Sequence, residues 1–204
     1  MKHYPSIPKD VRDDIDIIAF DKLDGSQIRA EWSKKRGFYK FGTKGHLIDA
    51  SEPIFGEAVG LIKSSYEESL SKIFKDQKYE NVICFFEFFG EHSFAGNHEV
   101  EPHKVILFDL APHKKGILPP REFLSLVGHL EIPSILYQGK ANASFISSVR
   151  NGTLSNMSGE GVVCKAKGGH KSSPNIVFKI KTQAWLDKLK SFCKDDNALY
   201  EKLS

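Results

Sequence analysis

Lys22 has the residue type and the surroundings of a nucleophile. It follows an apolar, β-branched run at residues 15–20 that predicts a buried strand, and Asp24 and Gly25 come shortly after it. A lysine amine attacks an electrophile only after losing its proton, and burial, nearby cations or a metal-bound phosphate can lower its pKa enough. The glycine would allow the backbone to approach a ligand closely. The alternative is an ordinary charged turn, which a pattern as short as K-x-D-G does not exclude.

Two later segments place further charged residues in strand patterns. In residues 160–165 (EGVVCK), an acid, a glycine and a lysine surround two β-branched residues. In residues 178–181 (FKIK), strand alternation puts Lys179 and Lys181 on one face and the apolar residues on the other. Two lysines on one face suit a triphosphate or its departing pyrophosphate. Taken alone, this segment is equally an amphipathic edge strand.

The apolar patterns also predict the elements that position these residues. Strand-like runs cover residues 15–20, 28–32, 37–41, 82–89, 104–110, 161–166 and 176–180. Apolar residues between Ser51 and Asp76 recur at three- and four-residue steps, which predicts an amphipathic helix with Ser51 as a candidate N-cap. We expect a short helix over residues 120–129 and a C-terminal helix over about residues 183–204. Because the strands cluster instead of alternating with helices, an α+β fold with largely antiparallel sheets is favoured.

Composition narrows the class of protein. The 204 residues carry a formal net charge of +3, which is compatible with a polyanionic partner, and no linker or repeat divides them. We therefore expect a single domain over residues 1–204. We expect no signal peptide and no membrane span, because no run of about 18 apolar residues occurs. The three cysteines lie far apart without CxxC pairing, which predicts a reducing, intracellular (cytoplasmic) location.

Taken in order, these motifs resemble those of the covalent nucleotidyltransferase superfamily, which contains DNA ligases, RNA ligases and mRNA capping enzymes. Residues 22–25, 160–165 and 179–181 are similar to motifs I, IV and V. Residues 85–90 (FFEFFG) and 105–110 (VILFDL) are similar to motifs III and IIIa. The resemblance covers most of the chain. It implies a nucleotidyltransferase (adenylation) domain of the ligase type, with two largely antiparallel β-sheets flanked by helices.

The resemblance implies a covalent role for one residue and metal or base contacts for others. Lys22 would attack the α-phosphorus of a nucleotide and form a lysyl phosphoramidate. Glu160 would bind or position a divalent cation, Mg²⁺ or Mn²⁺, and Glu87 would contact the ribose or help to organise the metal site. Phe108 would stack on one face of the purine. Strand alternation sends some of the neighbouring phenylalanines of residues 85–89 into the core instead.

The remaining nucleotide contacts follow from the same resemblance. Either Val162 or Val163 would cover the second face of the purine, and Asp21 is a candidate for its edge. Asp24 and Gly25 belong to the motif that presents the nucleophile. The phosphates would be neutralised by three lysines: Lys165, Lys179 and Lys181. Such cations, with a metal ion, stabilise the negative charge that develops on the phosphoryl oxygens and on pyrophosphate.

One segment departs from the family's motifs, and a set of histidines lies outside them. Ligases commonly carry an arginine in motif Ia, whereas here the matching segment holds Lys44, which keeps the charge but loses the bidentate fork. Arg29 and Arg36 are alternatives. Three histidines, His92, His98 and His103, match no familiar zinc spacing, so a structural or surface role is expected.

The residues after motif V and the motif III segment indicate a branch of the superfamily. Only residues 182–204 follow motif V, and they read as one amphipathic helix, so we expect no OB-fold domain here. The motif III segment is similar to that of the RNA ligase 2-like branch. The resemblance thus implies an ATP-dependent RNA ligase: Lys22 is adenylylated, AMP passes to a 5′-phosphate RNA end, and a 3′-hydroxyl displaces it. We expect a helper protein or a nicked duplex to provide the contacts with RNA that further domains provide in other ligases.

Three other functions remain open at this point. The enzymatic ones are a minimal ATP-dependent DNA ligase and a GTP-dependent capping guanylyltransferase. The third is a non-catalytic module that binds nucleotides or RNA ends. The presence of Lys22, Glu160 and both lysines of motif V argues against this last function, because a module without catalysis has no need of the nucleophile.

Overall fold

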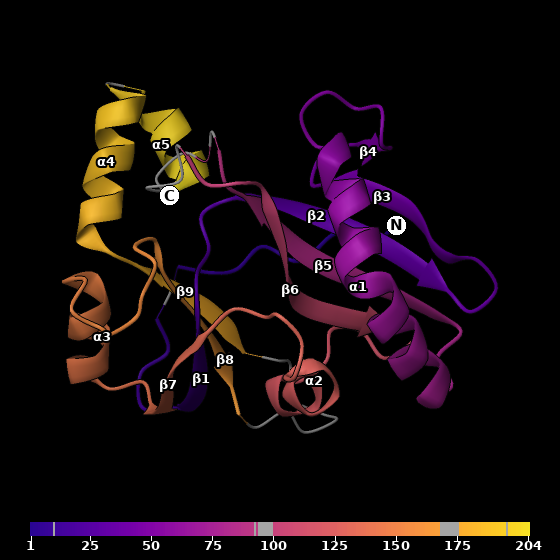
Figure 1. Ribbon diagram of the computed structural model, residues 1–204. Helices are drawn as coiled ribbons and strands as arrows, with labels where there is room; N and C mark the ends of the chain where they lie inside the picture. Colours follow the sequence, from indigo (N-terminus) through magenta and orange to yellow (C-terminus); the bar gives the residue numbers. More distant parts are fainter. Residues whose placement is uncertain (10, 92, 94–99, 168–175, 195) are drawn as a thin grey trace. The chain divides into compact units, whose positions relative to one another are not determined.

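The computed structural model describes residues 1–9, 11–91, 93, 100–167, 176–194 and 196–204. The chain forms two compact units (Figure 1). The first contains Met1–Pro5, Gly25–His92 and His98–Ile132, and the second contains Ser6–Asp24, Ser93–Asn97 and Pro133–Ser204. Each has its own antiparallel sheet and its own apolar core, which confirms the α+β class predicted from the clustered strands. That residues 1–204 form a single domain stays a prediction.

A five-stranded antiparallel sheet with the order β4-β3-β2-β5-β6 organises the first unit. Its strands are β2 (Ser26–Ser33), β3 (Gly37–Thr43), β4 (Leu47–Ile48), β5 (Asn81–Phe89) and β6 (Lys104–Pro112). Alternate residues of these strands enter one core, as Ile28 and Ala30 of β2 and Cys84 and Phe86 of β5 show. The residues between them, such as Arg29 of β2 and Glu87 of β5, point to the other face of the sheet.

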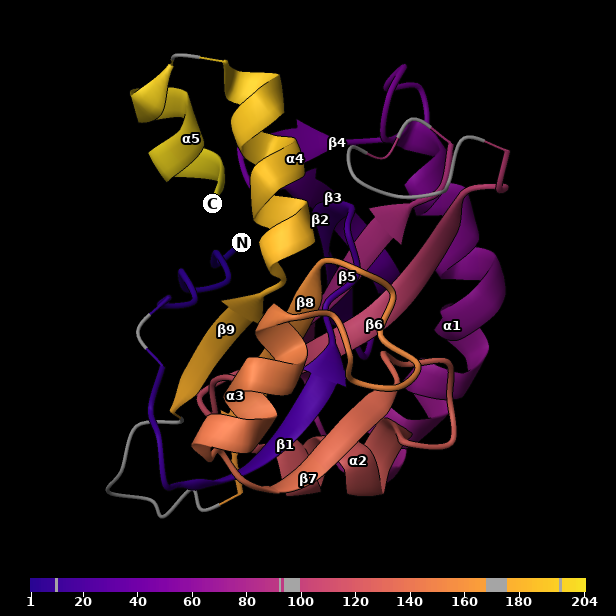
Figure 2. The same cartoon turned by 90° about the vertical axis from the view of Figure 1, so that its left-hand side faces the viewer.

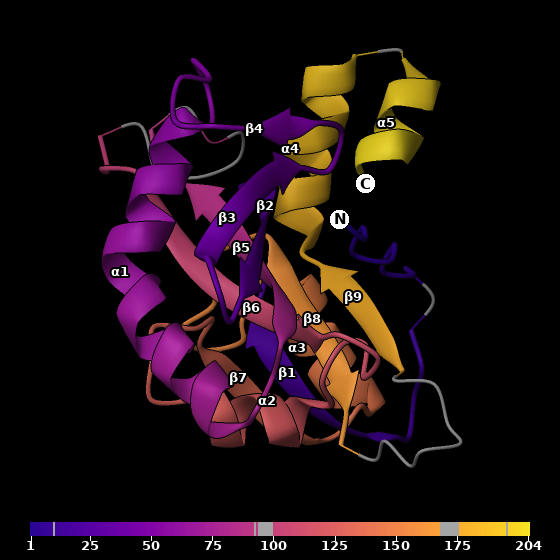
Figure 3. The same cartoon turned by 90° about the vertical axis from the view of Figure 1, so that its right-hand side faces the viewer.

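Two helices, α1 (Gly56–Asp76) and α2 (Pro120–Val127), complete the first unit, and α1 packs along the sheet (Figures 1 and 3). The predicted apolar stripe of α1 faces the core, with Val59, Ile62, Tyr66 and Leu70 all buried. Burial of each side chain of this size contributes about 1.5–3 kcal/mol. This confirms that the predicted helix is amphipathic, with its apolar stripe facing the core.

The predicted start of that helix at Ser51 is wrong. The amide and hydroxyl of Ser51 both donate to Asp49 Oδ1, at 2.8 and 2.6 Å. The Glu52 carboxylate accepts hydrogen bonds from the amides of Ile54 and Phe55. These local bonds fold the segment into turns, because short side chains compete with the helix for backbone groups. The helix begins only at Gly56.

The second unit has a four-stranded antiparallel sheet with the order β7-β1-β8-β9. Its strands are β1 (Asp16–Asp21), β7 (Ile135–Lys140), β8 (Gly161–Ala166) and β9 (Val177–Lys181). Helix α3 (Ala143–Arg150) covers one face of this sheet (Figure 2), where its Phe145 and Val149 pack with β8 and β9. Neither β7 nor α3 was predicted from the sequence. They have few buried apolar residues, and the serines of α3 are weak helix formers.

The C-terminal segment contains two helices where one was predicted. Helix α4 (Gln183–Cys193) ends at Lys194, whose φ of 52° is incompatible with a continuing right-handed helix, and α5 (Asn197–Leu203) follows. Trp185 and Leu189 of α4 form a small apolar cluster with residues of α5. None of the described helices combines the length and hydrophobicity that crossing a membrane requires.

Candidate active site

Sheet order in the second unit brings three separate motifs to one place. Lys22 directly follows β1, which pairs with β8, and β8 pairs with β9. The Lys22 amide donates to Gly161 O at 3.0 Å, and Gly161 lies opposite Lys181 in the register. The end of β1, the start of β8 and the end of β9 therefore lie side by side, although they are far apart in the sequence.

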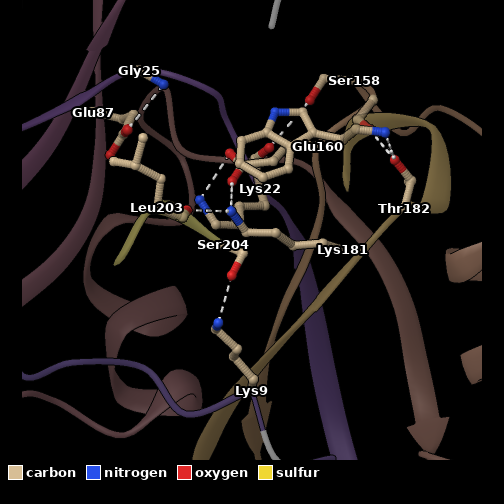
Figure 4. Close-up of polar contacts among 12 residues, drawn as sticks. Lys9, Lys22, Gly25, Glu87, Ser158, Glu160, Lys181, Thr182, Leu203 and Ser204 are labelled. Atoms are coloured by element: carbon tan, nitrogen blue, oxygen red, sulfur yellow. Dashed lines mark hydrogen bonds and ion pairs between the residues drawn. The ribbon is translucent and has the colours of Figure 1, made fainter. Parts of the chain in front are cut away.

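The Glu160 carboxylate bridges two lysines (Figure 4). Its Oε2 accepts a hydrogen bond from Lys22 Nζ at 2.8 Å, and its Oε1 lies 3.0 Å from Lys181 Nζ. The side chains of Lys22, Glu160 and Lys181 are only 21, 4 and 7% exposed. A carboxylate this buried requires paired charge, because isolated burial of an ion is costly. The arrangement is a compact cluster of one acid and two cations.

Lys181 is the more enclosed of the two lysines. Burial lowers its pKa to about 8, against the opposing effect of Glu160. Its Nζ lies 3.4 Å from the centre of the Trp185 ring, in cation–π geometry, and donates to Leu203 O at 3.3 Å. The amphipathic α4 thus contributes an aromatic wall to the cluster.

The two faces of this sheet carry different chemistry, as the alternation of β9 predicted. Val162 packs in the apolar core under α3, so Val163 is the valine on the opposite face. Val163 lies opposite Lys179 in the register, and Lys165 is on the same face as Val163. Lys165 Nζ lies 5.1 Å from the centre of the Phe20 ring. The structure therefore favours Val163 over Val162 as a residue that meets a ligand.

Asp21 and Thr182 hold the segment that carries Glu160. The Asp21 carboxylate accepts hydrogen bonds from the amide and hydroxyl of Ser158, at 3.0 and 3.1 Å. Burial raises the pKa of Asp21, and these two hydrogen bonds oppose that shift. The Thr182 hydroxyl donates to Gly159 O at 2.7 Å and caps α4. Sequence reasoning missed both Ser158 and Thr182. The role of Asp21 at the edge of a base stays a prediction.

Gly161 permits the close approach of β8 and β9. Its φ is 142°, and a Cβ at this position would lie 2.1 Å from Ile180 O. We expect Gly161→Ala to lower the free energy of unfolding by about 3 kcal/mol or more, because backbone strain and a backbone clash add. Urea unfolding measures this change. Gly159→Ala is the matched control, since Gly159 has a φ of 124° but open space around it. Equal losses in both variants would contradict a role for the clash.

In the first unit, Glu87 is bound to the glycine of the K-x-D-G motif. The Gly25 amide donates to Glu87 Oε1 at 3.1 Å (Figure 4), and a Cβ on Gly25 would lie 2.3 Å from Phe88 O. Phe86 and Phe88 belong to the core under α1, as alternation predicted for some of these phenylalanines. Glu87 occupies an alternate position of β5, and so points away from that core.

The three candidates for motif Ia differ in their surroundings. Arg29 is buried, and its Nε and Nη2 both donate to Thr43 O, which makes it part of the interior of the first unit. The guanidinium of Arg36 lies 3.6 Å from the centre of the Tyr39 ring. Lys44 is exposed in the turn between β3 and β4. The geometry favours Lys44 for contact with an external phosphate.

Of the three histidines, His103 has a defined role in the structure. Its Nδ1 lies 2.6 Å from Glu57 Oε2, and its Nε2 lies 2.9 Å from Glu91 O. His92 and His98 lie outside the described residues. Among the described residues, no group of three or more His, Cys, Asp or Glu side chains is placed to hold a metal ion.

The His103–Glu57 pair predicts a small pH dependence of stability. The hydrogen bond with Glu57 raises the pKa of His103, so its stabilisation is complete below the unfolded pKa of about 6.5. That contribution is lost as the pH rises through the folded pKa. Because Glu57 is more than half exposed, we expect at most about 1 kcal/mol. Urea unfolding of wild type and His103→Gln at pH 5.5 and 8.5 measures it, and a pH-independent difference would contradict it.

The donor set fits a magnesium-type ion held jointly with a nucleotide. Mg²⁺ typically takes one or two carboxylates and completes its coordination with phosphate oxygens and water. Glu160 supplies one buried carboxylate, beside Lys181, a cation that suits phosphate. A metal with an all-protein cage is not expected from these residues.

The family model for RNA ligase matches residues 15–181. The chain belongs to the RNA ligase family. The matched span begins one residue before β1 and ends with Lys181, so it includes every motif of the resemblance. No curated protein sequence matches the chain.

Solved structures of an RNA ligase from Naegleria gruberi share the fold. The pyrophosphate complex matches with a TM-score of 0.64 at 18% identity, covering 88% of this chain and 53% of that one. A lysine-to-alanine variant with ATP and manganese gives 0.62 at 18%, covering 86% and 52%. An aspartate-to-alanine variant without ligand gives 0.63 at 17%, covering 92% and 59%. The chain thus spans a little over half the length of these RNA ligases.

Proposed function

We propose that this RNA ligase family member is an ATP-dependent RNA ligase that acts through a lysyl-AMP intermediate on Lys22. The observation that carries the proposal is the Glu160 carboxylate between Lys22 and Lys181. It joins a nucleophile, an acid suited to a divalent cation and a phosphate-binding cation within one cluster. An ordinary surface ion pair would be exposed, whereas these three side chains are largely buried.

In the first step, the deprotonated Lys22 Nζ attacks the α-phosphorus of ATP. The new N–P bond forms as the P–O bond to pyrophosphate breaks, and the attacking nitrogen releases its proton to solvent. Lys179 and Lys181 stabilise the charge on the departing pyrophosphate, since both lie on the face of β9 opposite the core. A Mg²⁺ or Mn²⁺ ion held by Glu160 would supply further charge neutralisation at the phosphates.

Nucleoside contacts are assigned to each unit separately. In the first unit, Phe108 stacks on the purine, and Glu87 contacts the ribose or helps to organise the metal site. In the second unit, Val163 makes the apolar contact with the base and Lys165 binds phosphate. Two structures of Naegleria gruberi RNA ligase variants hold ATP or AMP with manganese, which supports the choice of adenosine nucleotide and divalent ion.

The later steps transfer AMP from Lys22 to a 5′-phosphate RNA end, after which a 3′-hydroxyl displaces AMP and forms the phosphodiester. We propose that the two RNA ends are presented in a nicked duplex or together with a helper protein. All three cysteines are buried thiols, which supports a reducing, cytoplasmic setting.

Nucleotide labelling tests this function. The protein is incubated with Mg²⁺ and α-labelled ATP or GTP, and label that survives denaturation is measured. We expect label from ATP. Label from GTP alone would favour capping, and no label from either nucleotide would exclude the covalent mechanism. Labelled protein is then given nicked RNA, nicked DNA or single-stranded RNA. Preferential sealing of the DNA nick would instead favour a minimal DNA ligase.

A further inference from the structure

Phe108 lies in an irregular part of β6. The register passes from Asp109 opposite Phe85 to Leu107 opposite Phe86, so Phe108 is the extra residue of a β-bulge. The bulge has a packing reason. Leu107 and Leu110 both enter the core under α1, and an odd spacing of three cannot face one side in a regular strand. A bulge re-aims side chains, so the strand ladder alone does not orient the Phe108 ring.

Tyr4 contacts the residues around this bulge. Its ring centre lies 5.2 Å from that of Phe108 and 5.0 Å from that of Phe85, with interplanar angles of 78° and 73°. These are favourable edge-to-face geometries. The Tyr4 hydroxyl donates to Asp109 Oδ2 at 2.6 Å, and Asp109 is fully buried. One tyrosine therefore holds the bulge by two ring contacts and a charge-assisted hydrogen bond.

The segment that carries Tyr4 is anchored to the interior of the first unit. Arg29 Nη1 donates to Met1 O and Lys2 O, each at 3.3 Å, while other nitrogens of the same buried guanidinium bind Thr43 O. Burial, with the Asp109 carboxylate, raises the pKa of Tyr4 well above its ordinary value, so its hydroxyl remains a donor at neutral pH. Tyr4 is thus a fixed part of this unit.

We propose that Tyr4 is a positioning residue that orients the Phe108 ring for stacking on the nucleobase. This inference rests on the proposed function, in which Phe108 is the base platform. Stacking depends on the angle and offset of the two rings. A Phe108 ring that rotates freely has to be ordered when the base binds, which weakens binding. Tyr4 contributes to binding of the nucleoside. Pyrophosphate has no base, so its binding does not depend on Tyr4.

Calorimetric binding of two ligands tests the inference without requiring any covalent step. Dissociation constants for ATP and for pyrophosphate are measured in protein that carries Lys22→Ala and so cannot form the adduct, alone and together with Tyr4→Phe or Tyr4→Leu. We expect Tyr4→Phe to weaken ATP binding about three- to tenfold, the worth of one hydrogen bond. Tyr4→Leu also removes the ring contacts, so a loss of about tenfold or more is expected. Pyrophosphate binding stays unchanged in both.

Tyr39→Phe is the matched control, because the Tyr39 hydroxyl donates to Glu31 at 2.7 Å in the same unit. It should leave both dissociation constants unchanged. Unchanged ATP binding in both Tyr4 variants, or equal weakening of ATP and pyrophosphate, would overturn the inference. Should Tyr4→Leu fail to fold, Tyr4→Phe still decides. Wild type that binds ATP but forms no covalent adduct would contradict the proposed function and not this inference.

Discussion

Replacing Lys22 with alanine is expected to abolish covalent capture of AMP, lowering its rate by at least about a thousandfold, because no other group supplies the attacking nitrogen. The measurement is label from α-labelled ATP on denatured protein. Lys140→Ala is the matched control, since Lys140 is an exposed lysine of the same unit, paired with Asp14 at 3.0 Å. Label that persists in Lys22→Ala at the wild-type rate would contradict the assignment of the nucleophile.

Lys22→Ala also separates the first step of ligation from the last. RNA that already carries AMP on its 5′-phosphate needs no lysine nucleophile, so the variant should still seal such RNA while failing on 5′-phosphate RNA with ATP. The contrast between the two substrates is independent of protein concentration and folding yield. If Lys22→Ala lost both reactions equally, the nucleophile would not be the explanation for its defect.

The second large effect is expected from Glu160→Gln, with adenylylation slowed about 100- to 1,000-fold. The substitution keeps the size of the side chain but removes the negative charge that bridges Lys22 and Lys181. It also removes the carboxylate proposed to hold the divalent ion, so more Mg²⁺ should be needed for half-maximal rate. The rate of label incorporation across a Mg²⁺ series measures both changes.

Glu201→Gln is the control for Glu160→Gln. Glu201 is an acid of the same unit that pairs with Lys9 at 3.4 Å, but its side chain is 74% exposed. An exposed pair of this kind contributes little, so the control should behave like wild type. Glu160→Gln should also reduce the free energy of unfolding by about 3 kcal/mol, because it leaves two enclosed lysines without their acid. Normal adenylylation by Glu160→Gln would contradict the account.

Much of the architecture around Lys22 was predictable from local patterns. β1, β8 and β9 are short apolar or alternating runs, and alternation alone placed Lys179 and Lys181 on one face of β9. Alternation does not predict the order of the strands in a sheet. The contact of Glu160 with both Lys22 and Lys181 arises because β8 lies between β1 and β9. Alternation also did not show which of Val162 and Val163 lies on the ligand-facing side of the sheet, because that depends on the position of the core.

Other features had weak or misleading signals. The helix predicted from Ser51 begins at Gly56, because the carboxylates of Asp49 and Glu52 accept hydrogen bonds from nearby backbone amides in turns. No residue of β7 is fully buried, so the strand lacks a clear apolar pattern. Tyr4 gave no signal, since its partner Asp109 is distant in sequence and the bulge that joins them arises from tertiary packing. The sequence does show Asp109 as an acid inside an otherwise apolar strand, but it does not identify Tyr4 as its partner.

Locating the nucleotide on the chain tests whether Lys22 is the nucleophile. The protein is incubated with ATP and Mg²⁺, denatured, digested and mapped by mass spectrometry. We expect one AMP adduct, on the peptide that contains Lys22, and its removal when pyrophosphate is added before denaturation. An adduct on Lys181 or another residue, or no adduct under conditions in which the protein binds ATP, would contradict this role for Lys22.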